Sequence, residues 1–308
     1  MSDEVTEHLR LLFVGVAPER SQEIEDFWTK YGPVVKVVSD DEQGNVPVME
    51  AGAYRYLHFN HRMLRVIWLL SFSAWEGYVM IHNGVTTGDL GDAAERFKDA
   101  LETAISVSKA TDPLSIKFPA GIPEPGPVDT LPVGSMARAA GEVAMFASGW
   151  AFLHECKHLM HQQEGTSGGD DPDACCTEEL FCDAFATRFL LERIGDYANE
   201  LNVQAAKVQL KRQLGIYFAL YAIAVIGRDQ WGATKTHPAV QARIDQALAL
   251  MSETGFSKGA AIFATGSFAA LQAVLKDVPS PLQAIAAKAA TENWSRAWLE
   301  DIGFSPKG

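Results

Sequence analysis

The first sixty residues alternate between short β-rich runs and one amphipathic segment. LLFVGVA (11–17), PVVKVVS (33–39) and AYRYLHF (53–59) are rich in the branched and aromatic residues that favour strands. SQEIEDFWTKYG (21–32), between the first two, begins with a serine suited to a helix N-cap and ends at a glycine suited to a helix end. The pattern predicts a small sheet near the N-terminus, with a short helix between two of its strands.

From His61 onward, apolar residues recur at the spacing of helices. One segment interrupts this pattern. TDPLSIKFPAGIPEPGPVDTLPVG (111–134) contains six of the 14 prolines, so it cannot form a helix. It is a candidate domain boundary or substrate-facing loop. Helices are expected over residues 61–82, 92–109, 136–163, 175–194, 197–226, 238–253, 258–275 and 281–299.

These elements predict a mainly α fold of the α+β class, with a helical core and a small N-terminal β element. Residues 1–110 are expected to form an α+β region, residues 111–135 a Pro/Gly-rich loop, and residues 136–308 a helical domain. A chain of 308 residues can bury about 75% of its unfolded surface. We expect these regions to pack as one unit.

Charge and composition narrow the class of protein. The net charge of −13 opposes binding to nucleic acid or to an anionic membrane surface. The first ten residues lack the basic region and apolar run of a signal peptide. The apolar stretches 63–81 and 216–227 are expected to be core helices, because the first carries two charges and the second is shorter than the roughly 20 residues that span a bilayer. We therefore expect a soluble cytoplasmic protein with no membrane span and no nucleic-acid partner; its oligomeric state is unknown from sequence.

The segment WAFLHECKHLMHQQE (150–164) contains the motif HECKH in a helix-compatible run. His154 and His158 are four residues apart, so both imidazoles lie on one helix face and can reach one metal ion. Glu155 is displaced by about 100° around the helix, where it can bond a water on the metal instead of the metal itself. A catalytic zinc site of this kind also needs a third protein ligand and an open position.

The next helical segment, CCTEELFCDAFATRFLLERI (175–194), offers that third ligand. Glu179 and Asp183 are also four residues apart and share a helix face. Glu179 would complete a His-His-Glu set, while Asp183 can accept the other N–H of a ligand histidine. Glu178 is the rival ligand, but the residue four positions after it is a cysteine, so it lacks an acidic partner.

Other interpretations of these residues remain open. HECKH has only three fixed positions, so it can also be an ordinary helix face with a Glu–Lys pair. His161 is expected at the rim of the site, and Glu164 is a weaker candidate for the third ligand. The cysteines are expected to be free thiols or metal-associated; no CxxC pair occurs, so small buried residues are favoured over a structural zinc site of two adjacent cysteines and a histidine. The cysteines are Cys156, Cys175, Cys176 and Cys182.

The motif HExxH followed by ExxxD on the next helix resembles the gluzincin arrangement of thermolysin-type zinc metallopeptidases. The string THPAVQARI (236–244) is similar to the H-P-x4-R-I pattern of the CAAX-processing and HtpX-type metallopeptidases. Chain length and a mid-chain HExxH also resemble the family of the phage-exclusion peptidase Lit. The resemblance covers roughly residues 145–250 and does not include the transmembrane helices of the HtpX and CAAX families.

This resemblance implies a zincin-like core and a role for each matching residue. The implied set is His154, His158 and Glu179 as ligands of Zn²⁺, Asp183 as a supporting acid and Glu155 as the general base. His237 and Arg243 match residues near the substrate carbonyl, where a donor stabilises the developing oxyanion. Without that role, His237 is a residue at a helix start and Arg243 forms a surface ion pair.

The function expected from these residues is that of a zinc metalloendopeptidase acting on a protein or peptide substrate. Glu155 takes a proton from the attacking water and later delivers it to the leaving amine. A Lit-like role in phage defence fits the resemblance. The alternatives are a non-catalytic helical interaction protein with a structural or degenerate metal site, and a hydrolase acting on another bond. An exposed strand edge beside the site would favour the peptidase, because extended peptides pair with such edges.

Overall fold

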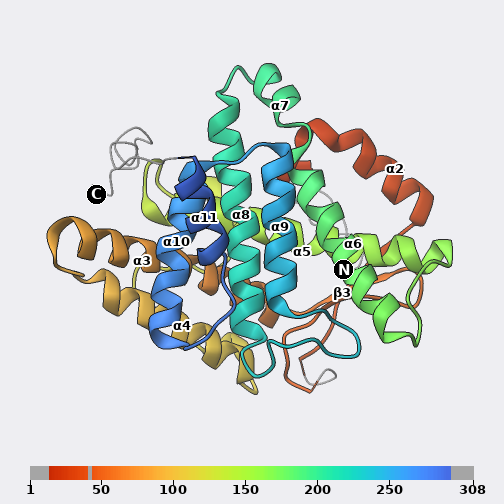
Figure 1. The fold of residues 1–308 in the computed structure, drawn as a ribbon. Helices are drawn as coiled ribbons and strands as arrows, with labels where there is room; N and C mark the ends of the chain where they lie inside the picture. Colours follow the sequence, from red (N-terminus) through yellow and green to blue (C-terminus); the bar gives the residue numbers. More distant parts are fainter. Residues whose placement is uncertain (1–13, 41–43, 293–308) are drawn as a thin grey trace.

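The structure, a computed structural model, describes residues 14–40 and 44–292 (Figure 1). The described chain is mainly helical, with one three-stranded sheet near its N-terminus, which confirms the predicted fold class. The α-helices are α2 (Ser21–Tyr31), α3 (His61–Thr87), α4 (Ala93–Lys109), α5 (Met136–Glu164), α6 (Pro172–Leu191), α7 (Ile194–Glu200), α8 (Ala205–Ile226), α9 (Val240–Thr254), α10 (Lys258–Val274) and α11 (Leu282–Thr291). The short 3-10 helices are η1 (Pro18–Arg20), η2 (Pro113–Ser115) and η3 (Val128–Thr130).

The sheet has the strand order β1-β3-β2, with β1 at Val34–Val37, β2 at Met49–Gly52 and β3 at Tyr56–Phe59. β1 is parallel to β3, and β2 is antiparallel to it. The strands expected within 33–39 and 53–59 are therefore present. β2 was not expected, because its sequence MEAG has no branched or aromatic residue; its pairing with β3 determines its conformation.

The strand predicted over 11–17 is wrong for the part that the structure describes. Residues 14–16 are helical, and residues 11–13 lie outside the described ranges. The side chain of Val16 packs on the backbone of α5 at Gly149, where an added Cβ would come within 2.8 Å of it. A short apolar run suits a buried helix turn as well as a strand, so its period could not decide between them.

The predicted helices are present in the described ranges, with changes at their ends. Ser21 is the first residue of α2 and does not cap it, because η1 precedes it directly. α6 starts at Pro172, earlier than expected, because the Asp171 side chain caps its N-terminus. The helix expected over 197–226 is divided into α7 and α8, with Asn202 at a positive φ of 52° between them. Of the helix expected over 281–299, residues 293–299 lie outside the described ranges.

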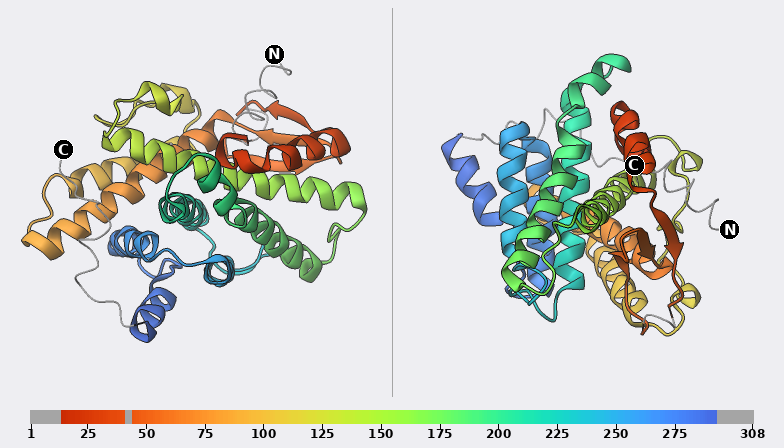
Figure 2. Two further views of the ribbon diagram at one scale, coloured as in Figure 1. Left: turned by 90° about the horizontal axis from the view of Figure 1, so that it is seen from above. Right: turned by 90° about the vertical axis from the view of Figure 1, so that its right-hand side faces the viewer.

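Helix α5 separates two parts of the molecule. In both views of Figure 2 the sheet and α2 lie on one side of α5, and α8, α9 and α10 lie on the other. Small residues allow close packing on α5: the Gly141 backbone lies against the ring of Trp68 in α3. The HECKH motif in α5 therefore lies between the sheet and the C-terminal helices.

Helix α3 is long and apolar enough to cross a membrane by length and composition alone. However, 83% of its most apolar window is buried inside the protein. Its charged side chains are paired within the fold: Arg62 contacts Asp40, and Glu76 contacts Arg96. This burial is that of a core helix.

The Pro/Gly-rich segment 111–134 is anchored on α3. Pro123 accepts a hydrogen bond from Trp68 Nε1 at 2.8 Å, and Glu124 pairs with Arg65 at 2.6 Å. None of its residues is among those that line the cavity described below. These two contacts fix the segment 111–134 to the core helix α3.

Candidate metal centre

Helices α5 and α6 bring the candidate residues together. α5 begins at a Ser135 cap and carries HECKH in its C-terminal half. Gly165 ends α5 in a left-handed conformation, the chain turns through residues 166–171, and α6 packs back on α5. This return places Glu179 beside the two histidines, as the loop length between them predicted.

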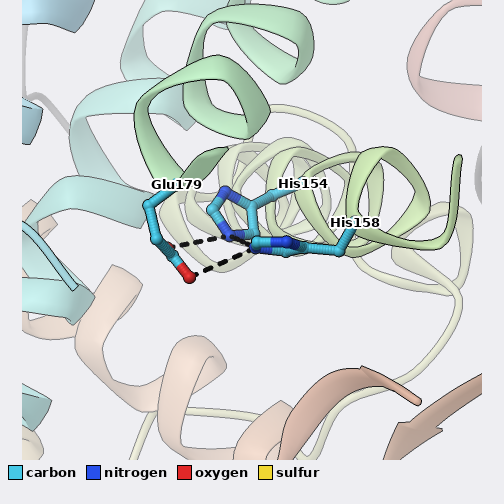
Figure 3. Close-up of side chains that lie close together, drawn as sticks. All are labelled: His154, His158 and Glu179. Atoms are coloured by element: carbon cyan, nitrogen blue, oxygen red, sulfur yellow. Dashed lines mark hydrogen bonds and ion pairs between the residues drawn. The ribbon is translucent and has the colours of Figure 1, made fainter. Parts of the chain in front are cut away.

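The side chains of His154, His158 and Glu179 converge on one point (Figure 3). The two Nε2 atoms are 3.1 Å apart. His154 Nε2 lies 3.3 Å from Glu179 Oε2, and His158 Nε2 lies 3.2 Å from Glu179 Oε1. The ligand atoms of the three residues all lie within 4.8 Å of one another, a spacing that one metal ion can bridge.

The chemistry of these atoms fits a cation. Two imidazole nitrogens and a carboxylate all offer lone pairs, and such atoms approach closely only with a proton or a metal between them. Glu179 Oε2 is buried and accepts no hydrogen bond within the described part of the chain. Burial alone would raise the pKa of Glu179, but the contacts with both histidines outweigh it and hold the pKa well below its usual range. The carboxylate is thus ionised and ready to bind a cation.

His154 is held from the buried side of the centre. Its Nδ1 lies 2.8 Å from Asp183 Oδ1, and Arg243 Nε and Nη2 each donate to Asp183 at 2.7 Å. Burial would lower the pKa of His154, but Asp183 and Glu179 outweigh it and raise the pKa to about 10. Asp183 is 1% exposed, and its ion pair with Arg243 helps to keep its pKa low despite burial.

His158 is held by a different carboxylate. Its Nδ1 lies 2.7 Å from Glu178 Oε1. The other oxygen of Glu178 accepts hydrogen bonds from Ser167 Oγ at 3.0 Å and from the Gly168 amide at 2.6 Å. The sequence had suggested Glu178 only as a rival metal ligand, because the i+4 spacing gives no sign of a contact with the loop before α6.

Glu155 lies beside the centre and also contacts the sheet. Its Oε2 accepts a hydrogen bond from the Ala51 amide of β2 at 2.9 Å, and its Oε1 is 4.0 Å from His154 Nε2. Burial raises the pKa of Glu155, although the two histidines oppose the shift. The contact with β2 could not be predicted, because β2 itself was not.

His237 and Arg243 come to the centre in different ways. His237 is half-exposed on the loop before α9, with Nε2 3.4 Å from Glu179 Oε1. Arg243 is buried in α9, and its bidentate pairing with Asp183 leaves Nη1 3.9 Å from Glu179 Oε2. The surface ion pair considered for Arg243 is wrong, since the partner and the arginine are both buried.

A cavity of about 660 Å³ opens at the centre. Its polar lining includes the two motif histidines, Glu155, Glu178 and Glu179. Its apolar lining comes from several elements and includes Met49, Met63, Ile67, Trp150, Ala219, Ile223 and Val240. The edge strand β2 contributes Met49, Glu50 and Ala51, so the cavity joins the candidate metal centre to a strand edge.

The other residues that the sequence suggested, His161, Glu164 and the cysteines, are not part of the group formed by His154, His158 and Glu179. His161 Nδ1 bonds Thr166 Oγ1 at 2.8 Å, and Glu164 pairs with Lys30 of α2 at 3.0 Å. The four cysteines are free thiols. Cys182 forms a second possible ligand group with His158 and Glu178, which overlaps the first.

The molecule is thus a mainly helical protein with a candidate metal centre formed by an HExxH helix and the helix that follows it. The family model of Peptidase U49 matches residues 57–263, more than half of the chain, so the chain belongs to this family. Membership indicates a peptidase. The matched region extends from β3 into α10 and includes the whole centre. No match is found among curated proteins or among solved structures.

Proposed function

We propose that this protein is a zinc-dependent metallopeptidase that hydrolyses a peptide bond in a protein or peptide. One observation supports this most strongly: His154, His158 and Glu179 converge in a cavity that is also lined by the edge strand β2. The three residues would hold Zn²⁺. Zn²⁺ supplies Lewis acidity, which polarises a carbonyl group and acidifies water.

Glu155 is the proposed general base. The Ala51 amide holds one of its oxygens, which leaves Oε1 directed toward the histidines. Burial raises the pKa of the carboxyl, and a raised pKa suits a group that first accepts a proton from water and then delivers it to the leaving amine.

The edge of β2 is the proposed substrate-binding element. Ala51 directs its N–H and C=O away from β3, where they bond Glu155 and Gln162. Met49, two residues earlier, has the same orientation in an antiparallel strand and lines the cavity. An extended peptide would therefore pair with this edge at Met49, the position that Glu155 and Gln162 do not occupy, with its scissile carbonyl near the centre.

His237 is the proposed donor to the oxyanion. Its side chain is half-exposed and its Nε2 lies close to Glu179. Arg243 was expected to share this role, but two of its three nitrogens are bound to Asp183. We therefore assign the direct contact with substrate to His237 and an indirect, positioning role to Arg243.

We further propose a Lit-like role, cleavage of one host protein by a cytoplasmic enzyme during phage infection. The support is the resemblance to the phage-exclusion peptidase Lit, together with membership of a peptidase family. Fold and family alone do not determine a substrate, so this part of the proposal depends on finding one.

The rival function is a non-catalytic protein with a structural zinc site. The proximity of His237 to Glu179 favours it, because a fourth protein ligand would close the site. Against it, His237 is not in the group whose ligand atoms lie within 4.8 Å of one another in the described chain. A His237→Ala variant separates the two, since zinc is lost only if His237 is a ligand.

The deciding experiment measures the zinc content of the purified protein beside His158→Ala and Glu155→Gln. We expect about one zinc in the wild type and in Glu155→Gln, and none in His158→Ala. Glu155→Gln then serves as a trap for substrate, compared with wild type in the same extract. A wild-type protein that binds no zinc when it is supplied would falsify the proposal.

A further inference from the structure

Glu178 is buried, with only 8% of its surface exposed, and both of its carboxylate oxygens have hydrogen-bond partners. Oε1 faces His158 Nδ1 at 2.7 Å. Oε2 faces the hydroxyl of Ser167 and the amide of Gly168. The side chain thus connects one histidine of the metal centre to the loop between α5 and α6.

The contact determines which nitrogen of His158 carries the proton. A carboxylate only accepts hydrogen bonds, so Nδ1 must be the donor, and in the neutral ring Nε2 is then the nitrogen that keeps its lone pair. Nε2 is the atom that faces His154 and Glu179. Oε2 of Glu178 accepts hydrogen bonds from both the Gly168 amide and the Ser167 hydroxyl, so the carboxyl group acts as an acceptor on the side away from His158.

We propose that Glu178 is the positioning residue of His158, and that the loop segment 165–168 belongs to the metal centre because it holds Glu178 in place. The carboxylate fixes the tautomer and the ring orientation of the histidine, and the loop fixes the carboxylate. This inference rests on the metal site of the proposed function.

The loop is built closely around this contact. A Cβ on Gly168 would lie 2.5 Å from the backbone nitrogen of Cys175, so only glycine brings this amide against α6. Gly165 and Gly169 have positive φ angles of 69° and 59°. The glycines thus allow the chain to reverse tightly and to direct the Gly168 N–H at Glu178.

The competing assignment makes Glu178 a metal ligand together with Cys182 and His158, and the ligand atoms of these three residues also lie within 4.8 Å of one another. Two observations disfavour it. Both oxygens of Glu178 already have partners. Burial raises the pKa of the Cys182 thiol, which favours the protonated form over the thiolate that binds metals.

The test combines zinc affinity, by chelator competition, with the tautomer of His158, by ¹⁵N NMR of histidine-labelled, metal-free protein. We expect Glu178→Ala to weaken zinc binding about 10–100-fold and to reduce the Nδ1–H tautomer of His158. Glu178→Gln keeps an acceptor, so its zinc affinity should fall by less than that of Glu178→Ala. Gly168→Ala should shift both measurements in the same direction, because it displaces the loop amide.

Two further variants serve as controls. Glu164→Gln makes the same carboxylate-to-amide change at the end of α5, outside the cavity lining, and should bind zinc as wild type does. Cys182→Ser should also bind zinc normally, and a loss comparable to that of Glu178→Ala would overturn the inference in favour of the competing site.

The inference is also overturned if Glu178→Ala and Glu178→Gln retain wild-type affinity and the wild-type tautomer. If Glu178→Ala fails to fold, Glu178→Gln and Gly168→Ala provide the same test. Failure of the proposed function has a different signature: the wild type itself binds no zinc, while the NMR of the metal-free protein still reports whether Glu178 sets the tautomer.

Discussion

The two histidines of HECKH are held from two different regions of the molecule. His154 is supported from the core, where the buried ion pair of Asp183 and Arg243 connects α6 to α9. His158 is supported from the loop side, where the buried carboxylate of Glu178 depends on two donors of the more exposed loop before α6. One helical motif therefore relies on two supports of different physical character.

These two supports are expected to contribute differently to the stability of the fold and to the zinc affinity of the metal centre. Removing one partner of a buried ion pair leaves a charge without compensation, which costs several kcal/mol. Removing one exposed donor, such as the Ser167 hydroxyl, costs much less, because water can replace it. We therefore expect changes on the core side to lower the free energy of unfolding the most, and changes on the loop side to alter zinc binding with a smaller loss of stability.

The largest effect is expected for Asp183→Ala, which leaves Arg243 buried without its partner. The free energy of unfolding of the metal-free protein should fall by about 3–5 kcal/mol. Urea unfolding of this variant beside Glu178→Ala measures the comparison. Equal losses in the two variants would remove the distinction between the core side and the loop side.

A smaller effect is expected for Arg243→Lys, which keeps the positive charge but not the bidentate contact with Asp183. The loss of hydrogen bonds to a charged group should cost about 1.5–3 kcal/mol of unfolding free energy. Zinc affinity should fall as well, because Asp183 then orients His154 less firmly. Wild-type values in both measurements would show that the geometry of the pair is unimportant.

Zinc binding should depend on pH because protons compete for His154, whose pKa in the metal-free protein is about 10. Below that pH, zinc must displace the proton, so the apparent affinity should rise about tenfold, or about 1.4 kcal/mol, per pH unit for each proton released. Chelator competition at pH 6, 7 and 8 measures the slope. A flat profile would show that His154 is already neutral.

The same raised pKa has the opposite consequence for the metal-free fold. Protonated His154 stabilises the folded state relative to the unfolded state, where its pKa is near 6.5. This contribution is complete below pH 6.5 and is lost as the pH rises toward about 10. Zinc affinity and the stability of the metal-free protein should therefore change in opposite directions over this range.

The smallest effect is expected for Ser167→Ala, which removes one of the two loop donors to Glu178. The unfolding free energy should fall by about 0.5–1.5 kcal/mol, and zinc affinity should fall by less than in Glu178→Ala. Unfolding and chelator competition on the same preparation measure both. If zinc affinity falls as much as in Glu178→Ala, the Ser167 hydroxyl alone holds Glu178 in place.

Much of the fold was predictable because long helices carry a repeated signal. The apolar period placed α3, α4, α5, α9 and α10 within a few residues of their ends. Shorter elements carry too few residues for a period. The run at 11–17 was therefore misinterpreted as a strand, and β2 was missed, since both depend on what packs against them.

For the site, the sequence by itself determined what lies on one helix face. The spacing of four residues puts His154 beside His158, and Glu179 beside Asp183, whatever surrounds the helices. The loop length between them allowed α6 to return, and the structure brings the four side chains together.

Only the tertiary structure decided how these side chains are supported. It paired Arg243 with Asp183, Glu178 with His158 and the loop, and Glu155 with the edge of β2. Each contact joins elements whose relative position depends on the packing of the whole core, for which helical spacing carries no information. Local periodicity thus determined the candidate ligands, and long-range packing determined their environment.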